Sequence, residues 1–180
     1  SSSINGMIYV RGVPVDFAAW EQAGAKGWSW EEVLPYFIKA ERQQTHDDEL
    51  HGADGPLHVQ DVVDKRPIQE TFLDAMEEQG VPRNKDFNGI DQAGCGHYQF
   101  TQKDGRRWST SSAYLNPARG RSNLEIRTKV QTKRIIFEQN KAVGVETERA
   151  GRSETIRARH VILSCGAIGS PQLLELSGVG

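Results

Sequence analysis

The chain has 180 residues, a formal net charge of −2, and a composition that is 37% hydrophobic and 26% charged. This balance is ordinary for a soluble protein and gives no basic excess that would favour nucleic acid as a partner. No apolar run approaches the length of a membrane span, so we expect no transmembrane segment. The two cysteines, Cys95 and Cys165, lack metal-like spacing. We expect small buried or turn residues in a reducing compartment, rather than a disulfide or a nucleophile.

The first residues are a small-residue turn, Ser1–Ser3, followed by Asn5-Gly6 and an extended apolar run, Met7–Val10. Two interpretations are open. The loop either feeds a strand or lies flat against a ligand, since Ser, Asn and Gly allow a backbone to approach closely. The chain starts inside this turn and stops at Ser177–Gly180, just after a predicted helix. We therefore expect an internal piece of a longer protein.

Residues 16–42 are expected to form two helices separated by glycines. Asp16 can cap the first helix, and Ser29 is predicted as the N-cap of the second. Pro35 is expected in the first turn of this second helix, where a proline is tolerated. The aromatic side chains of the region favour a core over a binding platform; they are Phe17, Trp20, Trp28 and Phe37.

Residues 43–55 are polar and rich in turn formers, which predicts a loop or a domain crossing. Two histidines, His46 and His51, lie here with four acidic residues: Asp47, Asp48, Glu49 and Asp54. A metal site is one interpretation. We favour a solvated acidic loop, because the spacing fits no known set of metal ligands.

A short strand is expected over 56–59 and an amphipathic helix over 67–79, which Gly80 ends. The apolar side of this helix carries Ile68, Phe72, Leu73 and Met76. A second short strand is expected near 98–101, before a turn at 103–105. One hydroxyl of Ser109–Ser112 should cap a helix over 113–115. Arg106 and Arg107 either meet a phosphate or form a solvated, salt-bridged face.

The pattern changes to strands after Asn123. Alternating side chains predict strands over 124–128, 132–138, 142–148 and 153–158, with a hairpin turn at 139–141 and a further turn at 150–152. Residues 160–165 are predicted as a buried strand. A turn of small residues follows, and then a helix with Ser170 as N-cap and Pro171 at its first position. Such a junction presents backbone N–H groups and a positive helix end, as nucleotide sites in α/β proteins do.

These motifs resemble the glucose–methanol–choline (GMC) oxidoreductases, FAD-dependent enzymes that oxidise alcohols. The opening SSSINGMIYVRG is similar to the segment that lies against the flavin ring, and the closing GAIGSPQLLELSGVG to the second signature of the family. The intervening motifs keep the family order: DF…W at 16–20, GWSW…LPYF at 27–37, GADGPL at 52–57 and GRRWST at 105–110. The resemblance covers essentially the whole chain and is closest to the choline dehydrogenase and alcohol dehydrogenase branch.

The resemblance implies a mixed α/β (α+β) fold that is incomplete in this chain. One domain has the FAD/NAD(P)-binding dinucleotide fold, and a substrate domain is built on an antiparallel sheet. Residues 1–50 would supply the flavin-facing segment and lid of the FAD-binding domain, and 101–180 would continue that domain. Residues 51–100 would be an excursion into the substrate domain.

The resemblance also implies which residues bind the cofactor. Asn5, Gly6, Met7 and Ile8 would contact the isoalloxazine; Thr132 would sit where the backbone meets the adenine; and Cys165, Gly166 and Ala167 would line the FAD cleft. Some family members carry a His, bonded covalently to the flavin, at the position of Ile4, so FAD should here be noncovalent. The glycine-rich pyrophosphate turn is expected upstream of Ser1 and the catalytic His downstream of Gly180. No catalytic residue and no metal are therefore expected in this chain.

The implied reaction converts choline or another primary alcohol to its aldehyde. Hydride passes to flavin N5 while a histidine base takes the hydroxyl proton. The expected partners are a small-molecule alcohol and an electron acceptor, either oxygen or a quinone-type carrier. The full-length protein is expected in the cytoplasm or peripheral to the inner membrane. Two alternatives stay open: a hydroxynitrile lyase of the same fold, which binds FAD without net redox, and an inactive, truncated flavin-binding fragment.

Overall fold

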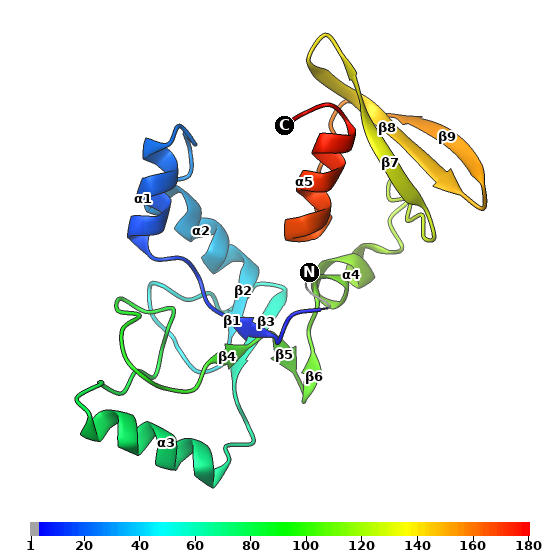
Figure 1. The fold of residues 1–180 in the computed structure, drawn as a ribbon. Helices are drawn as coiled ribbons and strands as arrows, with labels where there is room; N and C mark the ends of the chain where they lie inside the picture. The colour runs from blue at the N-terminus through cyan, green and yellow to red at the C-terminus, as the bar shows by residue number, and fades with distance from the viewer. Residues whose placement is uncertain (1–3) are drawn as a thin grey trace. The chain divides into compact units, whose positions relative to one another are not determined.

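The computed structural model describes residues 4–180, which divide into two compact units, one ending at Arg119 and the other comprising Gly120–Gly180. The elements of the first unit are β1 (Ile8–Tyr9), α1 (Pro14–Gln22), α2 (Trp30–Ala40), β2 (Glu41–Gln43), β3 (Leu57–Asp61), α3 (Pro67–Glu78), β4 (Gln99–Phe100), β5 (Gln102–Lys103), β6 (Arg106–Arg107), a π-helix (Ser111–Leu115) and α4 (Asn116–Ala118). Those of the second unit are β7 (Gln131–Glu138), β8 (Lys141–Arg149), β9 (Arg152–Arg157) and α5 (Gly166–Leu176). Figure 1 shows both sets.

A small mixed sheet organises the first unit. Its strand order is β1-β4-β3-β2, with β2 parallel to β3 and the other neighbours antiparallel. Val59 of β3 is fully buried at its centre. The expected strands near 56–59 and 98–101 are confirmed with slightly shifted bounds, as β3 and β4. The predicted turn at 103–105 joins the hairpin strands β5 and β6.

The two N-terminal helices follow their capping signals. Ser29 is the N-cap of α2, where its hydroxyl accepts from the Glu32 N–H at 3.4 Å. The first helix begins at Pro14, two residues before Asp16, whose carboxylate accepts from the Val13 N–H at 2.9 Å. Asp16 therefore caps α1 from inside its first turn.

Pro35 lies inside α2 rather than in its first turn, which corrects the expectation from the sequence. The helix starts at Trp30, so Pro35 is its sixth residue and removes one backbone donor from the second turn. The surrounding aromatic side chains form an edge-to-face cluster centred on Phe17, which is buried. The predicted core is confirmed at Phe17, whereas Trp20 and Trp28 at its margin are about half exposed.

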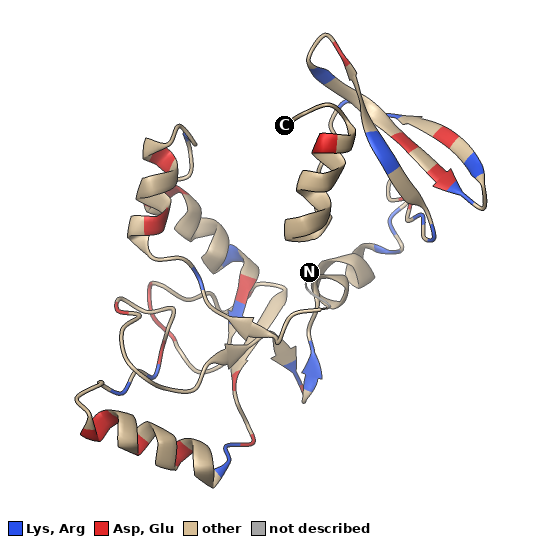
Figure 2. Cartoon of the chain, in the orientation of Figure 1, with Lys and Arg blue, Asp and Glu red and all other residues tan. Residues whose placement is uncertain are grey.

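Helix α3 matches its predicted range and ends with Gly80 at a positive φ of 86°. The Val81 N–H bonds the Met76 carbonyl and the Gly80 N–H bonds the Glu77 carbonyl, a Schellman motif. Acidic residues occur along the length of α3 (Figure 2). Of the predicted apolar side, Leu73 is buried, but Ile68 and Phe72 are 74% and 62% exposed.

A three-stranded antiparallel sheet, β7-β8-β9, forms most of the second unit, and α5 packs against β7. The turn at Gln139–Asn140 and the turn at Ala150–Gly151 use positive φ at both positions, which suits tight hairpins. Ile135 and Leu173 are buried in this unit, and the Ile135 N–H donates to Ser177 Oγ at 2.8 Å. The three predicted strands and both turns are confirmed.

Two further predicted strands are wrong. Residues 124–128 and 160–165 have no strand conformation, and no described strand pairs with them. Arg127 instead binds the carboxylates of Glu125 and Glu154, and Ile162 is 86% exposed. An alternating or apolar run becomes a strand only where a neighbour satisfies its backbone, and residues 4–180 supply none here.

The predicted start of the last helix is also wrong. Helix α5 begins at Gly166 with Cys165 as N-cap, so Pro171 lies inside it. Ser170 Oγ accepts from the Cys165 N–H at 3.1 Å, which stabilises the start from within the helix. The helix ends as predicted, with Gly178 at a φ of 84° in a Schellman motif.

The mixed α/β fold class is confirmed. The assignment of 1–50, 51–100 and 101–180 to two domains of a larger protein stays a prediction. Within the described residues, no helix is both long and apolar enough to cross a bilayer.

Candidate functional site

The segment Asn5–Ile8 forms an exposed turn at the start of β1. Asn5 Oδ1 accepts from the Met7 N–H at 2.8 Å, and Met7 takes a positive φ of 70°. Space is open above Gly6, because a Cβ built there would meet nothing within 4 Å. Ile8 is 51% exposed. A small, open backbone surface with an apolar edge suits a flat ligand.

The turn is held from β6 by Arg107. Its Nη1 donates to Asn5 Oδ1 at 2.7 Å and its Nη2 to the Asn5 carbonyl at 2.6 Å. Neither of the two earlier interpretations of the arginine pair describes this contact, since Arg107 binds a side-chain amide and a backbone carbonyl. Thr101 fixes the other side of the turn, where its N–H and hydroxyl both donate to the Met7 carbonyl at 2.8 and 3.2 Å.

Beyond β1 the chain is held by a buried side chain, Asn88. Its Oδ1 accepts from the Arg11 N–H at 2.7 Å, and its Nδ2 donates to the Tyr9 carbonyl at 3.0 Å. These are the bonds that a neighbouring strand would make. Gln99 of β4, also buried, extends the network to Gln43 of β2 at 3.1 Å.

A buried group of charges lies at the centre of the first unit. Glu41 is fully buried and forms a salt bridge with Arg11, while His51 Nδ1 lies 3.3 Å from both carboxylate oxygens of Glu41. His51 Nε2 lies 3.0 Å from Asp86 Oδ2. Burial lowers the pKa of His51, but hydrogen bonds to Asp86 and Glu41 outweigh it and raise this pKa to about 9. His51 is therefore a buried cation and not the solvated loop residue expected.

Two glycines allow this arrangement. A Cβ on Gly52 would lie 1.9 Å from the Ile38 carbonyl oxygen, and one on Gly55 would lie 2.3 Å from the Ala40 carbonyl group. The Gly52 N–H also donates to Glu41 Oε2 at 3.1 Å. The sequence motif from His51 to Pro56 thus docks the loop onto the end of α2, which is a structural role.

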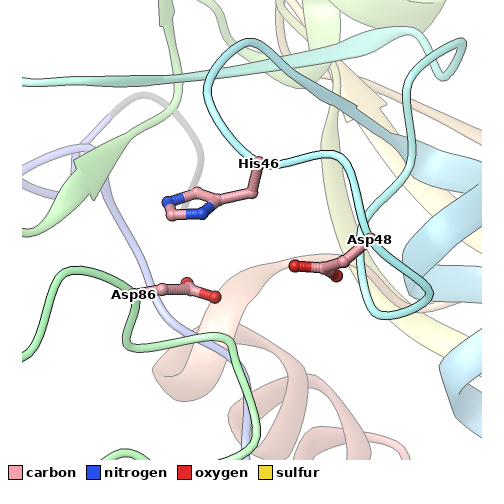
Figure 3. Close-up of side chains that lie close together, drawn as sticks. All are labelled: His46, Asp48 and Asp86. Carbon is pink, nitrogen blue, oxygen red and sulfur yellow. The ribbon is translucent and has the colours of Figure 1, made fainter.

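The side chains of His46, Asp48 and Asp86 point toward a common space (Figure 3). Their candidate donor atoms lie within 4.8 Å of one another, and the His46 ring stacks on His51 at 5.2 Å. Both Asp86 oxygens already accept hydrogen bonds, from His51 and from the Asn88 N–H. Sequence spacing does not reveal this contact, because Asp86 comes from the loop after α3. The expectation of no metal stays a prediction.

The predicted cofactor residues of the second unit fall at two places. Thr132 is half-buried in β7 and opposes Thr147 of β8. Cys165, Gly166 and Ala167 form the N-terminus of α5, where Cys165 and Ala167 are exposed and Gly166 has a φ of 87°. The structure thus brings Asn5–Ile8 into one turn and 165–167 into one helix start.

The family model for GMC oxidoreductases matches residues 1–180. The chain belongs to the GMC oxidoreductase family.

Named relatives of this GMC chain are enzymes. It is 46% identical to the oxygen-dependent choline dehydrogenase of Sinorhizobium medicae, over all of this chain and 33% of that protein. Pyridoxine 4-oxidase from Mesorbium loti superposes with a TM-score of 0.90 at 35% identity, over 99% of this chain and 36% of that one. An FAD-dependent oxidoreductase from Chaetomium thermophilum gives a TM-score of 0.89 at 28% identity, over 99% of this chain and 34% of that one. The chain spans about a third of the length of the proteins it matches.

Proposed function

We propose that the full-length protein is an FAD-dependent oxidoreductase that converts choline, or another primary alcohol, to its aldehyde. The observation that carries this proposal is the 46% identity to an oxygen-dependent choline dehydrogenase across every part of the chain. The likeness to a pyridoxine 4-oxidase supports a wider range of alcohols. Bound FAD would supply the hydride acceptor at its N5.

The residues present fit such a cofactor. The turn of Asn5, Gly6, Met7 and Ile8 offers open space above Gly6 and an exposed apolar side chain, as a flat isoalloxazine ring requires. In the second unit, Gly166 begins α5 with open space around it, and a helix N-terminus favours negative groups. We therefore assign these two segments and Thr132 to FAD binding.

This chain would bind and orient the cofactor and exclude water from one of its faces. We assign the base that takes the hydroxyl proton to a histidine downstream of Gly180. The two buried histidines within this chain are engaged in structural contacts: His51 is held between two carboxylates, and His58 has an edge-to-face contact with Trp108.

FAD should be held without a covalent bond, because Ile4 has no nucleophilic atom. Acid precipitation of the purified full-length protein should leave the flavin in the supernatant. Flavin that stays with the protein pellet would contradict this assignment.

The similarity to the oxygen-dependent choline dehydrogenase of S. medicae supports oxygen as the electron acceptor over a quinone-type carrier. Cytoplasmic location, or peripheral association with the inner membrane, stays a prediction for cell fractionation to test. Recovery of the protein in a periplasmic fraction would contradict it.

The function is tested on the purified full-length protein with choline, pyridoxine and a long-chain primary alcohol. We expect oxygen consumption and aldehyde formation with at least one of them, and with choline fastest. A hydroxynitrile lyase would show neither while cleaving a cyanohydrin, and that result would replace the proposal. The isolated 180-residue chain should be inactive in the same assay.

A further inference from the structure

The contacts of Asn5 fix the orientation of its side-chain amide. Two donors converge on one terminal atom of this side chain, the Met7 N–H at 2.8 Å and Arg107 Nη1 at 2.7 Å. An amide NH₂ group cannot accept from either donor, so this atom must be the oxygen. The other terminal atom, Nδ2, has no hydrogen-bond partner among residues 4–180 and belongs to an exposed residue.

Arg107 makes this orientation specific. The hydrogen bond from the Met7 N–H lies within the turn itself. Arg107 approaches from β6, and its planar guanidinium donates to two oxygens of Asn5, the side-chain Oδ1 and the backbone carbonyl. Arginine holds such a pair of acceptors in a fixed geometry that lysine cannot reproduce. Without Arg107, the amide would keep a single bond and could rotate.

We propose that Arg107 is a positioning residue, which fixes Asn5 so that its Nδ2–H group is presented to the cofactor as a hydrogen-bond donor. This inference rests on the proposed function. The cofactor edge facing Asn5 would then be an acceptor, such as a ring carbonyl. A donor beside such an edge, with a guanidinium behind it, stabilises negative charge, so the reduced flavin should benefit more than the oxidised flavin.

The test compares variants of the full-length protein. Arg107→Gln removes the fork and the charge, Arg107→Lys keeps the charge but removes the fork, and Asn5→Ala removes the presented amide. Arg106→Gln is the matched control, because Arg106 is the exposed neighbour in β6 and its side chain has no hydrogen bond within residues 4–180. The readouts are the FAD dissociation constant and the midpoint potential of the bound flavin.

We expect Arg107→Gln, Arg107→Lys and Asn5→Ala each to weaken FAD binding by roughly ten- to a hundredfold, the range for one lost charge-assisted hydrogen bond, and to lower the midpoint potential. The double variant of Arg107→Gln and Asn5→Ala should lose less than the sum of the two single losses, because Arg107 acts through the side-chain amide that Asn5→Ala removes. Arg106→Gln should match the wild type. If Arg107→Gln does not fold, the comparison of Arg107→Lys with Arg106→Gln decides.

The inference is overturned if the wild type binds FAD and the Arg107 variants behave as Arg106→Gln does. It is also overturned if Arg107→Gln and Asn5→Ala add, since their effects would then be independent. A wild-type protein that binds no FAD would overturn the proposed function together with this inference, which distinguishes the two failures.

Discussion

His51 Nε2 and Asp86 Oδ2 lie 3.0 Å apart and join two loops that are far apart in the sequence. Glu41 approaches the other ring nitrogen of His51, and Arg11 forms a salt bridge with Glu41. Arg11, two residues after β1, therefore shares one buried network with the start of β2 and both loops. This network holds the strand that carries the Asn5–Ile8 turn.

The first prediction concerns the pH dependence of this network. The pKa of His51 is raised from 6.5 to about 9, so its stabilising effect is complete below pH about 6.5 and is lost as the pH rises toward 9. Burial by itself would raise the pKa of Asp86. The hydrogen bonds from His51 and from the Asn88 N–H have the larger combined effect, so the pKa of Asp86 lies below its ordinary value of 3.8. The contribution of Asp86 is therefore present above its ordinary pKa and is lost in acid.

His51→Ala in the full-length protein should cost about 3 kcal/mol near pH 6, because it removes the buried cation that lies between the carboxylates of Glu41 and Asp86. Thermal unfolding from pH 6 to 9.5 measures this, with exposed His160→Ala as the control. The difference between wild type and His51→Ala should shrink toward the alkaline end. A difference that is constant across this range would show that His51 acts only by packing.

The second prediction concerns the glycines that dock the loop on α2. Gly52→Ala should destabilise the protein by about 3 kcal/mol or more, because its Cβ would lie 1.9 Å from a backbone oxygen that cannot move away easily. Gly120→Ala is the control, since nothing lies within 4 Å of its Cβ position. Equal denaturant midpoints for the two variants would contradict the close approach.

The third prediction concerns Asn88 as a substitute for a neighbouring strand. Asn88→Ala should cost about 1–3 kcal/mol, because it leaves the Arg11 N–H and the Tyr9 carbonyl unpaired in a buried place. It should also weaken FAD binding, because β1 is then less firmly held. Exposed Asn123→Ala should change neither quantity. An Asn88→Ala protein with wild-type stability and FAD affinity would contradict the role of Asn88 in holding β1.

The fourth prediction concerns the start of α5. Cys165 is an exposed free thiol at the N-cap, whereas Cys95 is buried. In FAD-depleted full-length protein, a thiol reagent should label Cys165 first, and added FAD should slow that labelling. Cys165→Ser identifies the labelled site. Labelling at an unchanged rate with FAD bound would place Cys165 outside the cofactor cleft.

Local signals predicted the elements that local chemistry decides. The Ser29 cap, the Gly80 stop and the turn at Gln139–Asn140 each depend on a few adjacent residues, and all three are confirmed. The strand at 160–165 was predicted from its apolar side chains alone. A strand also needs a paired neighbour, and an apolar run does not specify one. Helix α5 starts early because Ser170 caps it from inside.

The sequence indicated a candidate segment for FAD binding, which stays a prediction, and it did not indicate the contacts of that segment. The family resemblance indicated Asn5–Ile8, and the structure shows an open turn there. Arg107 and Asn88 were missed as partners of this segment, since each meets it from far along the chain. His51 was interpreted as solvated because nothing near it in the sequence predicts Glu41 and Asp86 as its neighbours.

The central claim is that the whole protein transfers hydride from an alcohol to bound FAD. The most direct measurement is the visible absorption of the full-length protein when choline is added without oxygen. We predict that the flavin band bleaches in proportion to the bound FAD and returns when oxygen is admitted. A flavin band that no primary alcohol bleaches, in a protein shown to bind FAD, would contradict the claim.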